Sequence, residues 1–373
     1  MSDKFRRFDS SQAVFFLLAI ITVILFSAVL KITAAVVVPF VVSVLLAIVI
    51  SPLVGFLEKF RIPRIISVLL VLLLLIGCLA FMGMILFNSG RTILTLYPRY
   101  EARLREIYVF IARFFELPYD EHLSFFDNIW GQVGIRNRLR VMTLSFSNGF
   151  LFFLSNAFMV ALFMAFLLFE AVFLREKLNR AFKGTRVGQI KKISSDLMTQ
   201  IAHYLSIKFI LSLITGVIVG VGLKIIGVEF ALLWGVIQFV LNFIPNVGSI
   251  AIGVIVSLFS LIQFWPAPMP VIATALLMLS TNVIIGSIME PKIMGDSLGL
   301  SPLIVLVSLL LWGWLWGFAG LILAVPMTAI IKIACENFPM LEPISIIMGS
   351  RKAAMAARGV NKDEKTEEPK ASE

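Results

Sequence analysis

Long apolar runs separated by short polar segments make up most of the chain. The pattern predicts membrane-spanning helices at about 13–30, 34–52, 65–87, 150–174, 207–226 and 271–289. Each run has about the 18 or more apolar residues that a helix needs to cross the hydrocarbon core of a bilayer. We therefore expect an all-α polytopic membrane protein with six transmembrane helices.

Two further apolar stretches, 230–263 and 301–332, are interrupted near their centres by glycine, proline or asparagine. The arms of the first stretch are 230–244 and 248–263. As helices of about 15 residues, these arms rise about 23 Å, which is less than the roughly 30 Å of the hydrocarbon core. We expect each stretch to form a re-entrant helical hairpin. The alternative is that both hairpins cross the membrane, which gives eight transmembrane helices.

The second half of the chain contains a weak repeat. In both copies a membrane helix is followed by a polar stop, Lys-Ile-Ile-Gly at 224–227 and Lys-Ile-Met-Gly at 292–295. The two copies differ somewhat in length. Gly248 follows Gly227 more closely in the first copy than Gly320 follows Gly295 in the second. Hairpins that enter from opposite sides form an inverted repeat. Interrupted apolar segments at corresponding places in two repeats point to a transporter's binding site.

Residues 88–145 are the longest polar segment between membrane helices and are expected to form a helical extracytoplasmic domain. Apolar residues recur there at intervals of four and three: Ile93, Tyr97, Tyr100, Leu104, Ile107, Ile111 and Phe114. Such a seam needs a partner helix. The partner is either the segment 123–130 of the same chain or the same helix in a neighbouring subunit.

Lysine and arginine residues set the expected orientation. The positive-inside rule places Lys4, Arg6 and Arg7 in the cytoplasm, together with the basic segment 175–206, whose apolar residues recur as in an amphipathic helix at the inner leaflet. Both termini are expected in the cytoplasm, and the tail is expected to be disordered from about 351. The chain is thus expected to divide into three helices at 1–87, the extracytoplasmic domain at 88–145, a fourth helix at 146–174, the amphipathic segment at 175–206, a transport core at 207–334 and a cytoplasmic tail at 335–373.

Composition supports the membrane class and excludes others. Hydrophobic residues make up 60% of the chain and charged residues 14%, against about 45–50% and 25% in an average soluble domain. The net charge of +10 follows from the bias of cytoplasmic loops, so we expect no nucleic-acid partner. Two cysteines and two histidines offer no disulfide framework and no metal spacing, and no glycine-rich nucleotide loop is present. We expect neither an enzyme nor a cofactor.

Polar residues within the apolar stretches are the candidates for chemistry. Asn242 and Asn246 flank the first hairpin tip, and Asn282 lies in the middle of the last spanning helix. Their amides can hold a polar solute or a monovalent cation, or can join helices to each other. Glu290 ends that helix and is either a coupling carboxylate, with Lys292 as competitor or switch, or an ordinary charge at the membrane surface.

Backbone-shaping residues complete the candidate set. The substrate or ion path is expected to include Pro245, Gly248, Gly317 and Gly320 beside the polar residues, because hairpin tips expose unpaired backbone groups. Lys208 is expected to extend to the membrane interface. The expected hinge or motif positions are Lys208, Gly227, Pro291, Gly295, Pro302 and Pro326.

The chain resembles the autoinducer-2 exporter family of bacterial membrane transporters over nearly its whole length, and most strongly over 200–332. The resemblance is carried by Tyr204 with Lys208, Leu233-Trp234-Gly235, the runs 242–249, 290–295 and 298–302, Trp312-Gly313, Gly317, Gly320 and Ala324-Val325-Pro326. It implies an oligomeric secondary transporter of the bacterial inner membrane. Members of the family export the quorum signal autoinducer-2, and others resemble Na⁺(Li⁺)/H⁺ antiporters.

Three functions remain open. The first is export of a small polar organic solute such as autoinducer-2. The second is Na⁺(Li⁺)/H⁺ antiport, which is disfavoured because the spans contain almost no carboxylate. The third is a membrane assembly protein that transports nothing. The expected partners are the lipid bilayer, the small polar solute or monovalent cation, and further copies of the chain.

Overall fold

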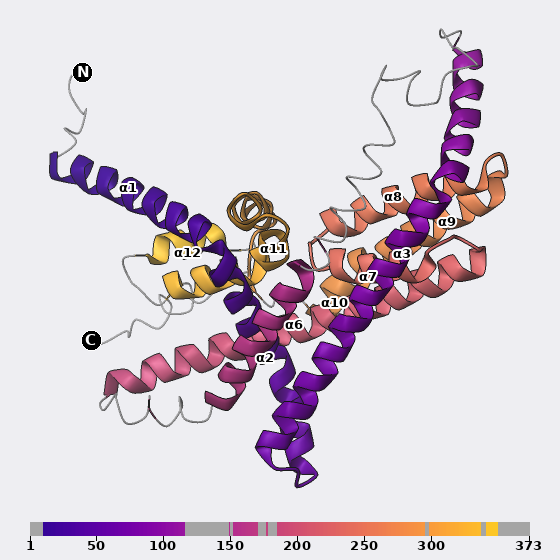
Figure 1. Cartoon of the computed structure of the whole chain (residues 1–373). Coiled ribbons are helices and arrows are strands. Elements are labelled where there is room, and N and C mark those ends of the chain that lie inside the picture. Colours follow the sequence, from indigo (N-terminus) through magenta and orange to yellow (C-terminus); the bar gives the residue numbers. More distant parts are fainter. Residues whose placement is uncertain are drawn as a thin grey trace, which may run out of the picture.

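The computed structural model describes residues 10–115, 149, 152–170, 177, 185–294, 298–336 and 341–349 (Figure 1). The described part is helical throughout, without a β-sheet. Its elements are α1 (Ser10–Ile32), α2 (Ala34–Lys59), α3 (Arg64–Phe114), an unlabelled helix at Phe152–Glu170, α6 (Thr185–Ile226), α7 (Ala231–Leu241), α8 (Val247–Phe264), α9 (Pro268–Thr281), η1 (Asn282–Met289), α10 (Glu290–Met294), α11 (Pro302–Glu336) and α12 (Glu342–Met348).

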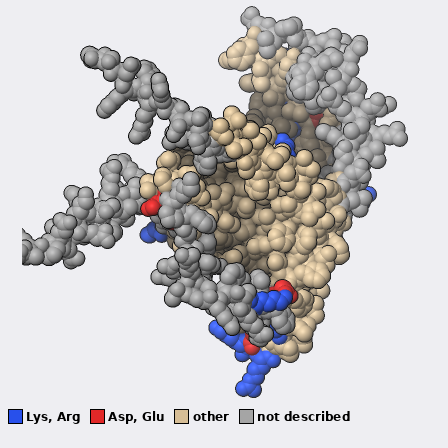
Figure 2. Space-filling model, turned by 90° about the vertical axis from the view of Figure 1, so that its left-hand side faces the viewer, with Lys and Arg blue, Asp and Glu red and all other residues tan. Residues whose placement is uncertain are grey.

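The surface of the described part carries many exposed hydrophobic side chains. In Figure 2 the described atoms are mainly tan, and the charged side chains gather in small groups. Large hydrophobic side chains are exposed along the long helices, such as Leu25 on α1 and Leu73 on α3, at 65% and 70% exposure. Seven helices of the described part are long and apolar enough to cross a membrane. The prediction of an all-α polytopic membrane protein is confirmed, whereas the choice between six and eight crossings stays a prediction.

The first half of the chain is a small helical bundle. Helices α2 and α3 meet at a tight turn at the bottom of Figure 1 and pack against the helix Phe152–Glu170. Met164 of that helix is fully buried beside Val68 of α3. The guanidinium of Arg64 donates to the carbonyl of Leu168 at 3.4 Å, which ties the start of α3 to the end of the neighbouring helix.

Helix α3 does not end near Phe87, where the apolar run stops, but continues as one helix of 51 residues to Phe114. The seam residues expected to begin a separate domain therefore lie on the extension of a membrane helix. Part of the seam packs against the second half of the chain: the rings of Tyr100 and Phe259 of α8 are 5.5 Å apart. The segment 123–130, one of the two expected partners, lies outside the described residues.

Helix α6 is also longer than the apolar pattern indicates. It joins the amphipathic segment and the following membrane helix into one helix of 42 residues. Its end is set by Gly227, whose φ of +88° is costly for any residue with a Cβ. The amide of Gly227 donates to the carbonyl of Lys224 at 3.2 Å and that of Val228 to the carbonyl of Leu223 at 2.9 Å, which is the Schellman pattern.

The first fold-back is present where the sequence places it. Helices α7 and α8 are joined by a short turn at 242–246, in which Asn246 has a positive φ of +59°. Directly after the turn, Gly248 is buried so closely that a Cβ there would lie 1.8 Å from the carbonyl oxygen of Leu241. Hydrogen bonds also join the two ends of the hairpin. The side-chain oxygen of Gln263 accepts from the backbone amide of Glu229 at 2.8 Å, and its side-chain nitrogen donates to the carbonyl of Gly227 at 2.9 Å.

The second fold-back lies within α11, which breaks at Gly317 with φ +60° and ψ −136°. After the break, a Cβ on Gly320 would lie 1.8 Å from the carbonyl oxygen of Trp312. The arms are joined by the indole nitrogen of Trp312, which donates to the hydroxyl of Thr328 at 3.1 Å. The ends are tied by Lys332, which is buried and whose ammonium lies 3.4 Å from the carbonyl oxygen of Leu298.

The two hairpins share one plan, and this plan favours another alignment of the repeat. Each begins near a glycine with positive φ, Gly227 in the first and Gly299 in the second. Gly299 precedes Gly320 by the same interval that separates Gly227 from Gly248. The glycine of the second stop, Gly295, lies outside the described residues. With Gly299 rather than Gly295 as the counterpart of Gly227, the glycine intervals of the two hairpins are equal, although the carbonyl group of Leu241 precedes Gly248 by seven residues and that of Trp312 precedes Gly320 by eight.

The helix at Pro268–Met294 is not a uniform α-helix. It begins as α9, widens into the π-helix η1 from Asn282 to Met289, and returns to α-helical form in α10. A π-helix of this length is rare, and π-helical segments occur frequently at functional sites. Glu290 is the first residue after the π-helix, and its carboxylate contacts Lys208 of α6.

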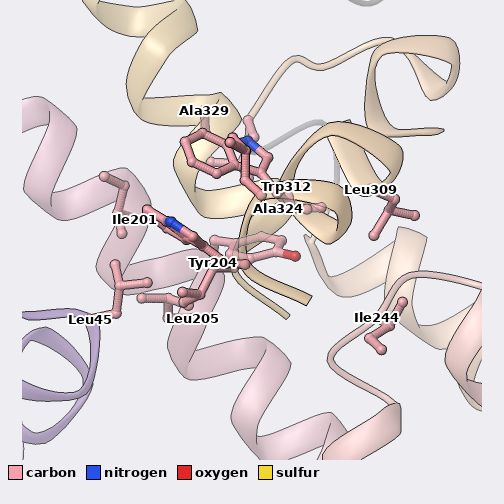
Figure 3. Packing of buried hydrophobic residues seen from close by; sticks show 14 residues of the cluster. Leu45, Ile201, Tyr204, Leu205, Ile244, Leu309, Trp312, Ala324 and Ala329 are labelled. Carbon is pink, nitrogen blue, oxygen red and sulfur yellow. The ribbon is translucent and has the colours of Figure 1, made fainter. Parts of the chain in front are cut away.

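The second hairpin packs into the largest apolar cluster of the described part (Figure 3). There the rings of Trp312 and Trp316 are 4.9 Å apart. Tyr204 and Leu205 of α6 reach the same cluster. Helix α12 packs against α11, and the amide of Ser301 donates to the carbonyl of Met348 at 3.0 Å. These contacts link α6 to the second hairpin.

The contact between Gly320 and Trp312 predicts a large effect of one methyl group. In a Gly320→Ala variant the hairpin must open, because a Cβ at 1.8 Å from a carbonyl oxygen is not tolerated. We expect almost no monodisperse protein on size-exclusion chromatography in detergent. Gly77→Ala is the control, since nothing lies within 4 Å of its Cβ and alanine favours a helix by about 0.5–1 kcal/mol. Equal yields of the two variants would contradict this account of the fold-back.

Candidate functional site

Helices α6 and α7 run antiparallel and approach each other through glycines. A Cβ on Gly216 would lie 2.7 Å from the carbonyl oxygen of Gly235, and one on Gly235 would lie 3.0 Å from the Cα of Gly220. Small residues allow such close backbone contact between membrane helices. The contact fixes the register in which the polar side chains of α6 and α7 meet.

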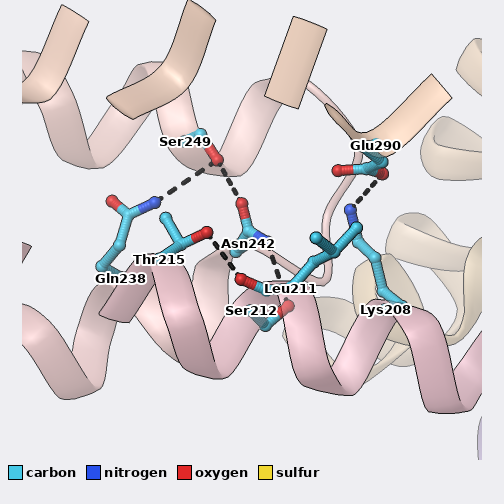
Figure 4. A network of polar contacts seen from close by, with 8 residues as sticks. All are labelled: Lys208, Leu211, Ser212, Thr215, Gln238, Asn242, Ser249 and Glu290. Atoms are coloured by element: carbon cyan, nitrogen blue, oxygen red, sulfur yellow. Dashed lines mark hydrogen bonds and ion pairs between the residues drawn. The ribbon is translucent and has the colours of Figure 1, made fainter. Parts of the chain in front are cut away.

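A chain of four polar side chains is buried between α6 and the first hairpin (Figure 4). The amide nitrogen of Asn242 donates to the hydroxyl of Ser212 on α6 at 3.0 Å. The hydroxyl of Ser249 on α8 donates to the amide oxygen of Asn242 at 2.8 Å. The amide nitrogen of Gln238 on α7 donates to Ser249 at a long 3.5 Å. All four are at most 8% exposed, so the turn of the hairpin brings a hydrogen-bonded polar group into an apolar interior.

This polar network lies half-way along a membrane helix. The apolar span of α6 extends from Met198 to Ile226, and Ser212 is its central residue. Because Asn242 bonds to Ser212, the tip of the first hairpin lies at the same level. Polar side chains at such depth are costly unless they are bonded to each other or to a ligand.

One turn before Ser212, Lys208 forms an ion pair with Glu290. The ammonium nitrogen of Lys208 is 2.5 Å from a carboxylate oxygen of Glu290. Lys208 is 2% exposed and is the largest fully buried side chain of the described part, and Glu290 is about one-fifth exposed. Lys208 was expected to extend to the membrane interface, but its side chain is buried and paired with Glu290 instead. Lys292, the expected competitor for Glu290, is exposed on α10.

Other candidate residues lie apart from this network. Asn282 is the first residue of the π-helix. Its amide oxygen lies against Gly286 one turn further along the same helix, 3.0 Å from where a Cβ of Gly286 would be. Asn246 is exposed and makes no side-chain cap bond, and Pro245 is half-buried beside it in the turn. Pro291 and Pro302 are exposed near helix starts, whereas Pro326 is buried in α11.

A second polar group joins α3 to the ends of the first hairpin. Arg99 pairs with Glu229 at 2.9 Å, and the hydroxyl of Tyr100 donates to the same carboxylate. Burial, and then the bond to Glu229, raise the pKa of the Tyr100 phenol, so this hydroxyl keeps its proton. Arg103 donates to the carbonyl of Trp265 at 2.9 Å. The extension of α3 thus holds the loops before α7 and after α8.

Ser212, Ser249, Gln238 and the pairing of Lys208 were missed in the sequence. The available signal was spacing: Lys208 and Ser212, and likewise Gln238 and Asn242, are four positions apart and so share a helix face. The described residues contain no group of three or more His, Cys, Asp or Glu side chains that suits a metal ion. Hydroxyls, amides and one ion pair can bind an uncharged polar solute or pass a monovalent cation.

The long apolar helices are those of a polytopic membrane protein. Two interrupted apolar hairpins and a buried polar network between the first of them and α6 are typical of a transporter. The family model of AI-2E family transporters matches residues 15–340, so the chain belongs to this family. A provisionally named transport protein of Haemophilus influenzae is 33% identical over 341 residues, covering 89% of this chain and 95% of the relative. A similarly named protein of Borreliella burgdorferi is 30% identical over 91% of both chains. The AI-2 transport protein TqsA of Escherichia coli is 29% identical, over 86% of this chain and 91% of TqsA.

The Lys208–Glu290 pair predicts a stability cycle. Lys208→Met and Glu290→Gln each leave a partner without its counter-charge, so each should lower the thermal midpoint in detergent by about 5–10 °C. The double variant removes both charges and should recover most of this loss. Lys292→Gln, an exposed change close to Glu290 in the chain, is the control and should change the midpoint little. Additive single effects in the double variant would show that the two groups are not paired.

Proposed function

We propose that this AI-2E family transporter is a secondary transporter that exports a small polar organic solute, with autoinducer-2 as the first candidate. The observation that carries the proposal is the buried network of Ser212, Gln238, Asn242 and Ser249 half-way along α6. It supplies donors and acceptors without net charge, which suits an uncharged solute. The name of the TqsA relative supports autoinducer-2.

The proposed transport cycle is alternating access around two re-entrant hairpins. The shared plan of the hairpins supports an inverted repeat, since the tips, the tied ends and the glycine intervals correspond. The tip of the first hairpin lies at the level of Ser212, the middle of the apolar span of α6, and this supports a hairpin that stops within the membrane. Non-helical backbone is tolerated at that depth where protein surrounds it or a cavity lies beside it.

The proposed setting is the bacterial inner membrane, with both termini in the cytoplasm and the extension of α3 outside. The basic residues of the first segment and of 175–206 support this orientation. We propose a homo-oligomer, in which the exposed apolar face of α1 meets lipid or a second copy.

The central role of Asn242 predicts a loss of transport without a loss of assembly. In inverted vesicles, Asn242→Ala should lower the rate of autoinducer-2 accumulation at least tenfold, because it removes the link between Ser212 and Ser249. Asn156→Ala is the matched control, since Asn156 bonds only to the carbonyl of Phe152 on its own helix in the described part. Elution volume on size-exclusion chromatography checks assembly. Unchanged accumulation in folded Asn242→Ala protein would refute the placement of the site.

The second candidate is Na⁺(Li⁺)/H⁺ antiport, which the Lys208–Glu290 pair favours. From the sequence, antiport was disfavoured because the spans contain almost no carboxylate. In the structure, the carboxylate of Glu290 lies beside the Asn242 network and pairs with the buried Lys208. A carboxylate in such a place can exchange a proton for a cation as the ion pair opens.

Dissipation of a pH gradient in inverted vesicles separates the two functions. If the protein is an antiporter, adding Na⁺ or Li⁺ collapses the gradient with wild-type protein and with Lys292→Gln, but not with Glu290→Gln. Exchange that survives in Glu290→Gln with the same pH dependence would exclude Glu290 as the coupling carboxylate. No response of the wild-type protein to any cation would leave organic solute export.

A further inference from the structure

Two buried polar atoms of the described part lack a hydrogen-bond partner there, and both belong to α7. They are the indole nitrogen of Trp234 and the amide oxygen of Gln238. One is a donor and the other an acceptor. Since the residues are four positions apart on one helix, their side chains lie on the same face, one turn from each other.

Both side chains face α8 and are held there by neighbours. The ring of Trp234 lies 5.3 Å from that of Phe259. Gln238 is 2% exposed and is bound through its nitrogen to Ser249, at a distance near the limit of a hydrogen bond. Its amide oxygen points away from Ser249 and from the rest of the network (Figure 4). The free atoms thus extend the Asn242 network by one helical turn.

Native proteins rarely leave buried polar atoms unpaired, because the lost bonds to water are not replaced. A donor and an acceptor one turn apart are both satisfied by a group that accepts one bond and donates another. A hydroxyl group does this. A carboxylate has no proton to donate to Gln238, and an alkali cation accepts nothing from Trp234.

We propose that Trp234 and Gln238 form a subsite that recognises a hydroxyl group of an uncharged, polyhydroxylated solute. In the bound state the indole nitrogen donates to the hydroxyl oxygen, and the hydroxyl proton is donated to the amide oxygen of Gln238. A neighbouring hydroxyl of the same solute takes over the weakly held amide nitrogen of Gln238 in place of Ser249. The inference rests on the proposed function and names the solute class of that same site.

The experiment uses the full-length protein in proteoliposomes and in detergent. The probes are autoinducer-2 and the matched pair ribose and 2-deoxyribose, which differ by one hydroxyl group. The variants are Gln238→Met, which keeps the length of the side chain without its amide, and Trp234→Phe, which removes the N–H and keeps an aromatic ring beside Phe259. The controls are Gln200→Met and Trp314→Phe, both at exposed positions.

We expect Gln238→Met to be at least as heat-stable as the wild type without solute, because an unpaired buried atom is gone. The stabilisation of the wild type by autoinducer-2 should disappear, and the KM for its transport should rise about tenfold or more. The preference for ribose over 2-deoxyribose in solute-induced stabilisation should fall to less than twofold. Trp234→Phe should act in the same direction, which keeps the test open if Gln238→Met does not fold.

Two other results would overturn the inference and can be told apart. If the variants transport and bind autoinducer-2 as the wild type does, the free atoms bind structural water and the subsite does not exist, while the proposed export stands. If the wild-type protein moves no organic solute, the proposed function fails and the subsite fails with it.

Discussion

Each hairpin depends on a glycine that lies against a backbone carbonyl directly across the fold-back. At Gly248 and Gly320 the space for a side chain is occupied by the carbonyl group of Leu241 or Trp312. Because the arms start so close together, the side chains behind the turn are also brought into contact. The bond between Asn242 and Ser249 in the first hairpin and that between Trp312 and Thr328 in the second both follow from this proximity. A backbone constraint therefore positions the polar chemistry.

Polar groups in the apolar interior are arranged by a consistent principle. Lys208 is paired with a carboxylate, Asn242 bonds on both sides, and Lys332 reaches a backbone carbonyl and Glu336 at 2.7 Å. Apart from the Lys332–Glu336 pair, which lies within α11, these bonds join different elements and so also fix their relative positions. The exceptions, Trp234 and Gln238, stand out because the rest is satisfied.

The apolar pattern predicted the helices and both fold-backs well, because lipid-facing helices must be apolar throughout and glycine, proline and asparagine mark the turns. It failed where the continuous apolar run stops but the same helix continues as an amphipathic helix. The extension of α3 beyond Phe87 and the joining of the amphipathic segment to α6 are of this kind. The second failure placed Lys208 at the interface and hid its pairing with Glu290. Partners 82 residues apart, such as these two, carry no local signal in the sequence, and neither does the π-helix that precedes Glu290.

The two hairpins share a backbone plan but not their side chains. When Gly227 is aligned with Gly299, the counterparts of Trp234, Gln238, Asn242 and Ser249 are Leu306, Leu310, Trp314 and Leu321. Identical repeats that exchanged conformations would give two transport states of equal free energy. In the proposed alternating-access cycle, the exchange would move an amide and hydroxyl group in one direction and an apolar group in the other, so that cycle predicts two states of different free energy even with equal solute on both sides. A difference of about 1.4 kcal/mol already gives a tenfold preference, and the proposed cycle therefore predicts a resting protein that faces mainly one side of the membrane.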